Sequence, residues 1–121
     1  MKEIFVAKRS ELQDGDRRIV VSDDLEIGVF RRNGALYAYR NLCAHQGGPA
    51  CEGLLMAKVE EIIAPDRTYQ GMRFSEDEIH IVCPWHGYEY NLATGECVGD
   101  RRFRLTKFRV VERGEDIYVL V

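Results

Sequence analysis

Short runs of β-branched and aromatic residues alternate with clusters of turn-forming residues along the whole chain. Their length and their alternation of apolar with polar positions predict β-strands rather than helices. The Asn33-Gly34 pair favours a tight hairpin turn, because both residue types accept a positive φ angle. We therefore predict an all-β domain of short antiparallel strands. The predicted strands are residues 4–7, 18–22, 26–31, 35–41, 79–82, 88–91, 103–112 and 117–121.

One stretch, residues 57–63, is open to two interpretations. Val59, Ile62 and Ile63 fit either a turn of helix or a strand with a bulge. Turn-forming residues follow at 65–67 and again at 75–78. With 121 residues the chain is long enough for one core and too short for two ordinary domains, so we expect a single domain over residues 1–121.

Composition narrows the classes of function. The chain is 45% hydrophobic and 31% charged, the balance of a globular protein rather than a disordered one. A formal net charge of −3 gives no basis for binding nucleic acid, and no apolar run is long enough to cross a membrane. The N-terminus lacks the apolar stretch of a signal peptide, so a cytoplasmic location is expected. Four cysteines in that reducing compartment favour a metal site over disulfides.

Two clusters interrupt the strand pattern, and each holds one Cys and one His. The first, residues 43–49, reads Cys-Ala-His-Gln-Gly-Gly-Pro, and the second, residues 83–88, reads Cys-Pro-Trp-His-Gly-Tyr. Each begins directly after an apolar run, which would anchor the loop on rigid structure. Two thiolates and two imidazoles suit either zinc or an iron–sulfur cluster. Zinc fingers, however, usually pair Cys with Cys and His with His.

The mixed C-x-H and C-x-x-H loops, with Gly-Gly-Pro after one and Pro-Trp-His-Gly in the other, resemble the Rieske iron–sulfur family. The resemblance implies an antiparallel β-sandwich with a small cluster-binding subdomain of two loops, here about residues 41–97. It also implies one [2Fe–2S] cluster per chain, with Cys43 and Cys83 on one iron and His45 and His86 on the other. The expected surroundings of the cluster are Gln46, Gly48, Pro49, Trp85, Gly87, Tyr88 and Tyr90.

The same resemblance bears on the reduction potential. Two neutral imidazoles in place of two thiolates make the oxidised cluster neutral, which raises the potential of the class. Respiratory relatives carry a disulfide between the loops, but this chain has Gly48 and Trp85 at those positions. Tyr88 stands where those relatives have a hydrogen-bonding Ser, whereas Tyr90 matches the family's Tyr. We predict a low potential with a modest upward correction, typical of the oxygenase-associated branch.

Other residues have simpler interpretations. Thirty-seven residues separate His45 from Cys83, more than in most ferredoxins of this family, and we assign the surplus to an insert at about 55–78. A protruding hairpin without a special role is favoured over a partner-docking flap. Cys51 and Cys97 match no ligand position and are expected to pack in the core. His80 is expected to be an ordinary strand residue rather than a ligand.

The resemblance implies a one-electron carrier, not an enzyme, that passes electrons from a flavin-dependent reductase to a terminal oxygenase or similar acceptor. Two alternatives stay open, namely a redox-sensing module and the small subunit of a nitrite reductase. Many such subunits lack the four ligands that this chain keeps. A complete ring-hydroxylating oxygenase would need a further iron site, for which only one His remains.

Overall fold

The computed structural model describes residues 2–44, 47–63, 65–67, 69–84 and 87–121. Over these residues the chain forms β-strands joined by turns, two of them single 3₁₀ turns, η1 (Arg9–Glu11) and η2 (Ala50–Glu52). None of the described helical turns is long and apolar enough to span a membrane. The strands are β1 (Glu3–Lys8), β2 (Arg17–Ser22), β3 (Leu25–Arg32), β4 (Ala35–Arg40), β5 (Leu54–Ile63), β6 (Tyr69–Val82), β7 (Glu89–Asn91), β8 (Lys107–Arg113) and β9 (Asp116–Leu120).

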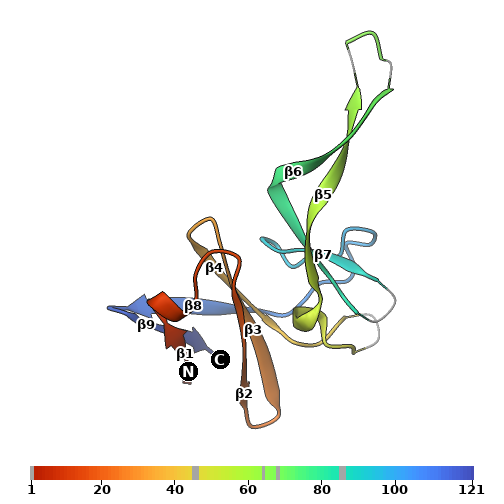
Figure 1. Ribbon diagram of the computed structural model, residues 1–121. Helices are drawn as coiled ribbons and strands as arrows, with labels where there is room; N and C mark the ends of the chain where they lie inside the picture. The colour runs from red at the N-terminus through yellow and green to blue at the C-terminus, as the bar shows by residue number, and fades with distance from the viewer. Residues whose placement is uncertain (1, 45–46, 64, 68, 85–86) are drawn as a thin grey trace.

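The strands form two antiparallel sheets. The larger has six strands in the order β1-β9-β8-β4-β3-β2, and the smaller has three in the order β5-β6-β7. Figure 1 shows the smaller sheet beside one end of the larger one, with β5 and β6 continuing as a hairpin beyond β7 and away from the larger sheet. This arrangement confirms the predicted all-β sandwich.

Strand β3 lies between two hydrophobic cores, because side chains of successive residues point to opposite faces of a sheet. Ile27 and Val29 pack with β1 and β9 inside the six-stranded sheet. Phe30 points the other way and packs in the core that the two sheets share. This shared core also contains Tyr39 of β4 and the two cysteines that begin the predicted ligand loops, Cys43 and Cys83. It therefore joins the sheets and carries the candidate site.

The turn between β3 and β4 has the expected geometry. Asn33 has a φ angle of 50° and Gly34 one of 80°. Two successive positive φ angles are the mark of a type I′ turn, whose twist matches that of the flanking strands. The predicted hairpin is confirmed, and its register pairs Arg32 with Ala35.

The region assigned to the insert consists mainly of strands β5 and β6. The ambiguous stretch 57–63 is the bulged strand rather than the helix turn, with register irregularities between Ala57 and Val59 and between Glu61 and Ile63. The predicted turn at 65–67 is present at 65–66, but the one predicted at 75–78 is wrong. Those residues continue β6, because a bulge opposite β5 absorbs them without ending the strand.

The predicted strand 103–112 begins four residues late, at Lys107. A turn precedes it, in which the Asp100 carboxylate accepts a hydrogen bond from the Arg102 amide at 3.0 Å. The Phe103 amide also donates to the Asp100 carbonyl, at 3.1 Å. Local hydrogen bonds of this kind hold the backbone out of a strand ladder.

Candidate metal centre

The two Cys-containing loops close in the same way. The Cys43 amide donates a hydrogen bond to the Gly48 carbonyl at 2.6 Å, and the Cys83 amide donates to the Tyr88 carbonyl at 2.8 Å. Each acceptor lies five residues after its cysteine. Each cysteine therefore begins a loop whose two ends are tied together, although the Cys-to-His spacing differs between the two motifs.

A glycine with a positive φ angle precedes the acceptor in both loops. The angle is 76° at Gly47 and 68° at Gly87. Residues with a side chain rarely adopt this conformation, so glycine is required where the loop turns back. The first loop has one further bond, from the Gly47 amide to the Cys43 carbonyl at 2.9 Å. The glycines of the motifs thus shape the loops.

Both cysteines are buried in the same hydrophobic core. Cys43 is 3% exposed and Cys83 is 0% exposed, and neither forms a disulfide. They pack in one cluster with Ile81, Tyr90 and Leu92, among others. The structure therefore brings two soft sulfur donors, forty positions apart in the sequence, into one apolar region from which water is largely excluded.

Tyr90 connects the second loop to the cysteine of the first. It lies on β7, immediately after the second loop, and its side chain is fully buried. The Tyr90 hydroxyl lies 3.0 Å from the Cys43 sulfur. Burial, more than the hydrogen bond to Cys43, raises the pKa of the Tyr90 hydroxyl far above its usual value, so the oxygen keeps its proton. It can donate that proton to a thiolate at Cys43.

Asn41 supports the first loop and was not identified from the sequence. It is only 6% exposed and lies two residues before Cys43. Its Oδ1 accepts a hydrogen bond from the Cys51 amide at 2.8 Å, and its Nδ2 donates to the Glu52 carboxylate at 3.3 Å. The first loop is thereby tied to η2. The sequence feature that could have indicated this role is a polar residue at the end of an apolar strand.

Gly53 allows η2 to lie against the end of β6, next to Cys83. A Cβ atom at this position would come within 1.8 Å of the Val82 carbonyl oxygen. No side chain can be accommodated there unless the backbone moves. Arg17 of β2 adds to this junction, since its guanidinium donates to the carbonyls of Cys51, at 2.9 Å, and of Gly53. Gly53 and Arg17 were also missed, because both act through contacts distant in sequence.

Cys51 and Cys97 are packing residues in the structure. Cys51 is fully buried, and it lies so close to β3 that a Cβ added at Gly28 would be 2.4 Å from its own. Burial raises the pKa of the Cys51 thiol to about 12, so it remains protonated and unreactive near neutral pH. Cys97 is 2% exposed and is bridged to Tyr90 through the backbone.

The remaining predicted site residues are only partly covered by the structure. His45, Gln46, Trp85 and His86 lie outside the described residues. Gly48 is buried, Pro49 is partly buried, and Tyr88 packs against the shared core. Within the described part of the chain, no group of three or more Cys, His, Asp or Glu side chains could hold a metal ion.

This donor chemistry fits a Rieske-type cluster. Two buried cysteines without a disulfide meet in one core, a protonated Tyr hydroxyl contacts one of them, and each cysteine starts a loop whose motif contains a His. An iron–sulfur cluster takes thiolates as ligands, and in a Rieske centre two imidazoles replace the other two.

Comparisons with known proteins agree with the geometry. The sequence model of the Rieske [2Fe-2S] domain family matches residues 2–109 of this chain. A human Rieske domain-containing protein is 29% identical over 93 residues, which are 77% of this chain and 48% of that protein. The chain thus spans about half the length of this curated relative.

Two solved structures share the fold over nearly the whole chain. One is a complex of reduced oxygenase and oxidized ferredoxin in carbazole 1,9a-dioxygenase, at 25% identity and a TM-score of 0.68, covering 97% of this chain and 91% of that one. The other is a putative NADH-dependent nitrite reductase small subunit from Mycobacterium tuberculosis, at 16% identity and a TM-score of 0.70, covering 98% and 93%. On the family match and on the two buried cysteine loops, we conclude that this chain belongs to the Rieske [2Fe-2S] domain family and holds a Rieske-type cluster.

Proposed function

We propose that this protein is a one-electron carrier rather than an enzyme. The observation that supports this most is that Cys43, Cys83 and Tyr90 are buried in the one hydrophobic core that the two sheets share. When bound there, the [2Fe–2S] cluster supplies a site that accepts and releases a single electron. The protein's part is to hold that cluster in a rigid apolar setting, which the closed loops and the shared core provide.

Cys43 and Cys83 are the proposed ligands of one iron, and His45 and His86 those of the other. The support is the family match together with the ligand spacing of the two motifs. Gln46, Gly48, Pro49, Trp85, Gly87, Tyr88 and Tyr90 are proposed to surround the cluster.

The residues around the cluster would set its reduction potential. With a thiolate at Cys43, the Tyr90 hydroxyl 3.0 Å away would be the donor, which withdraws negative charge from that ligand and favours the reduced state. Gly48 leaves no thiol at that position of the first loop for a disulfide to the second loop. With one such hydrogen bond and no disulfide, we propose a midpoint potential well below that of respiratory Rieske proteins.

The proposed partners are a flavin-dependent reductase as donor and a terminal oxygenase or similar protein as acceptor. The oxygenase is supported by the structure of a carbazole dioxygenase ferredoxin in complex with its oxygenase, which shares this fold at 25% identity. The proposed compartment is the cytoplasm, where free thiols such as those of Cys51 and Cys97 persist. Residues 1–121 are proposed to act as one domain, with an insert at about residues 55–78.

A subunit of a nitrite reductase is the second candidate. Its support is the fold shared with the putative small subunit from Mycobacterium tuberculosis, at 16% identity. The cluster-ligand motifs favour the carrier, because a subunit that only supports a larger enzyme has no need of four ligands.

A reductive titration tests the carrier function. The holoprotein is titrated with dithionite without air while its potential and visible spectrum are recorded. We expect one electron per chain and a midpoint potential well below those of respiratory Rieske proteins. A strongly positive midpoint potential would contradict the predicted membership of the oxygenase-associated branch. A protein that is reduced but that no added oxygenase reoxidises would favour the redox-sensing alternative.

A further inference from the structure

His80 is a buried polar residue of β6 that the proposed electron path does not use. It is 4% exposed. Its neighbours Ile79 and Ile81 pack in the shared core, so His80 lies on the opposite face of the small sheet. The register places it between Met56 of β5 and Asn91 of β7.

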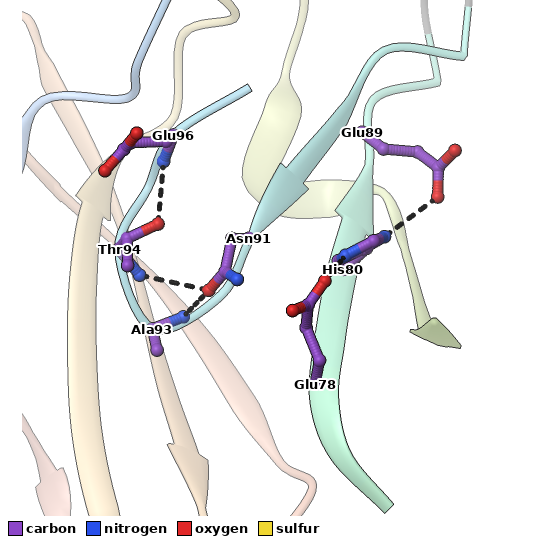
Figure 2. A network of polar contacts seen from close by, with 7 residues as sticks. All are labelled: Glu78, His80, Glu89, Asn91, Ala93, Thr94 and Glu96. Carbon is purple, nitrogen blue, oxygen red and sulfur yellow. Dashed lines mark hydrogen bonds and ion pairs between the residues drawn. The ribbon is translucent and has the colours of Figure 1, made fainter. Parts of the chain in front are cut away.

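Both ring nitrogens of His80 contact carboxylates (Figure 2). Its Nε2 lies 2.5 Å from the Glu78 carboxylate on the same strand, and its Nδ1 lies 3.1 Å from the Glu89 carboxylate on β7. Of the two residues paired with it across the sheet, Met56 is uncharged. The other, Asn91, engages its side-chain oxygen with the amides of residues 93 and 94.

Further charges line two pockets that Glu78 borders. Arg32 lines one of them, with a volume of about 290 Å³, together with Asn91. Glu96 and Arg101 line the other, with a volume of about 300 Å³. Glu96 forms an ion pair with Arg104 at 3.3 Å. Among the described residues, the charges that contact the imidazole directly are therefore the two carboxylates, with side-chain exposures of 33% for Glu78 and 49% for Glu89.

The hydrogen-bonding capacity of imidazole makes this arrangement dependent on a proton. A carboxylate only accepts hydrogen bonds, and a neutral imidazole has one N–H to donate. Both contacts are hydrogen bonds only when both ring nitrogens carry a proton. A neutral ring that keeps its bond to Glu78 would direct a lone pair of Nδ1 at the Glu89 carboxylate, and that contact would open.

The contact with Glu89 spans the base of the second cluster loop. Val82 pairs with Glu89, and the next pair along the hairpin is closed by the Cys83 amide and the Tyr88 carbonyl. The His80–Glu89 contact therefore joins β6 to β7 on the outer face of the small sheet. Tyr90 supports the same loop from the inner face.

We propose that His80 is a positioning residue whose protonated form ties the two strands beneath the second cluster loop, so that retention of the cluster depends on pH. This inference rests on the proposed function, since it requires that the loop holds the cluster. As the ring loses its proton, the tie to Glu89 opens and the loop releases iron more readily.

The test measures iron release from the holoprotein to a chelator at a series of values from about pH 5 to about pH 8. For the wild type we expect release to become about threefold to tenfold faster across this range, as expected for one partly exposed, charge-assisted hydrogen bond. His80→Gln, which cannot carry the extra proton, should release iron quickly at both ends of the range.

Glu89→Gln separates the proposal from a general structural role. The amide accepts from a protonated Nδ1 and donates to a neutral one, so the tie survives in both states. This variant should release iron slowly at both ends of the range. Glu112→Gln, which removes a carboxylate paired with Arg9 and Arg31 on the large sheet, should keep the wild-type profile.

The proposal is overturned if Glu89→Gln keeps the wild-type pH profile or if His80→Gln releases iron no faster than the wild type. Failure of the proposed function would look different. A protein without the cluster would hold no iron, and a protein that holds the cluster without acting as a carrier would fail the reductive titration while its iron release still followed pH.

Discussion

The two Cys loops have the same backbone closure but different supports. The first, from Cys43 to Gly48, is held from outside by Asn41, which ties it to η2. The second, from Cys83 to Tyr88, is the end of a hairpin and is held by the ladder between β6 and β7. In both loops the closing hydrogen bond and a positive-φ glycine set the backbone geometry. The support of each loop depends instead on the element that lies beside it.

The largest expected effect comes from removing either sulfur. Cys43→Ser and Cys83→Ser should each abolish the cluster, because each loop supplies one of two thiolates and neither can substitute for the other. Iron and sulfide analysis of the purified variants measures this. Cys97→Ser is the matched control, since Cys97 is buried outside the proposed ligand set, and it should retain the cluster. A fully loaded Cys43→Ser protein would show that the first loop is not a ligand loop.

Gly53→Ala tests the junction at which η2 meets the end of β6. The new Cβ would lie 1.8 Å from the Val82 carbonyl oxygen, so the backbone next to Cys83 must move. We expect a loss of about 3 kcal/mol in the free energy of unfolding, the upper part of the range for overpacking. Gly99→Ala is the control, because no atom lies within 4 Å of the added Cβ. Chemical denaturation of both variants should separate them, and equal stabilities would contradict the tight junction.

Asn41→Ala should weaken the first loop and leave the second unchanged. It removes the acceptor of the buried Cys51 amide, which costs about 2 kcal/mol when a buried donor is left without a partner. Gln13→Ala removes an amide that makes an exposed hydrogen bond at 3.4 Å, and it should cost little. Thermal unfolding compares the two variants. A loss in Gln13→Ala as large as in Asn41→Ala would refute a special role for Asn41.

Tyr90→Phe should cause the smallest change, in potential rather than in folding. It removes the hydroxyl 3.0 Å from the Cys43 sulfur and with it a donor that favours the reduced cluster. We expect the midpoint to fall by several tens of millivolts, where ~60 mV corresponds to a tenfold change for one electron. Voltammetry measures the shift. Tyr118→Phe, on β9 beside Phe5, is the control and should leave the midpoint potential unchanged. A similar fall in Tyr118→Phe would argue against a specific effect of the contact between Tyr90 and Cys43.

The sequence was informative wherever local chemistry decides the structure. The Asn33-Gly34 turn, the two motifs and the burial of Cys51 follow from residue type and spacing alone. Strand β6 was predicted only over 79–82, because residues 69–78 are mostly polar and their strand conformation depends on pairing with β5. The pairing also decides between the helix and strand interpretations of residues 57–63.

The supports of the site could not be predicted, because they depend on contacts between distant segments. Gly53 is required only because the Val82 carbonyl lies against it. The position of His80 between two carboxylates depends on the register of β6 with β7. The ligand motifs, by contrast, each span only a few consecutive residues, so residue type and spacing are enough to recognise them.

Mössbauer spectroscopy of protein purified without air and enriched in the iron isotope tests the central claim most directly. If Cys43 and Cys83 bind one iron and His45 and His86 the other, the oxidised protein should show two distinct iron environments of equal intensity. A single environment for both irons, or a protein that holds zinc and no iron, would contradict the account.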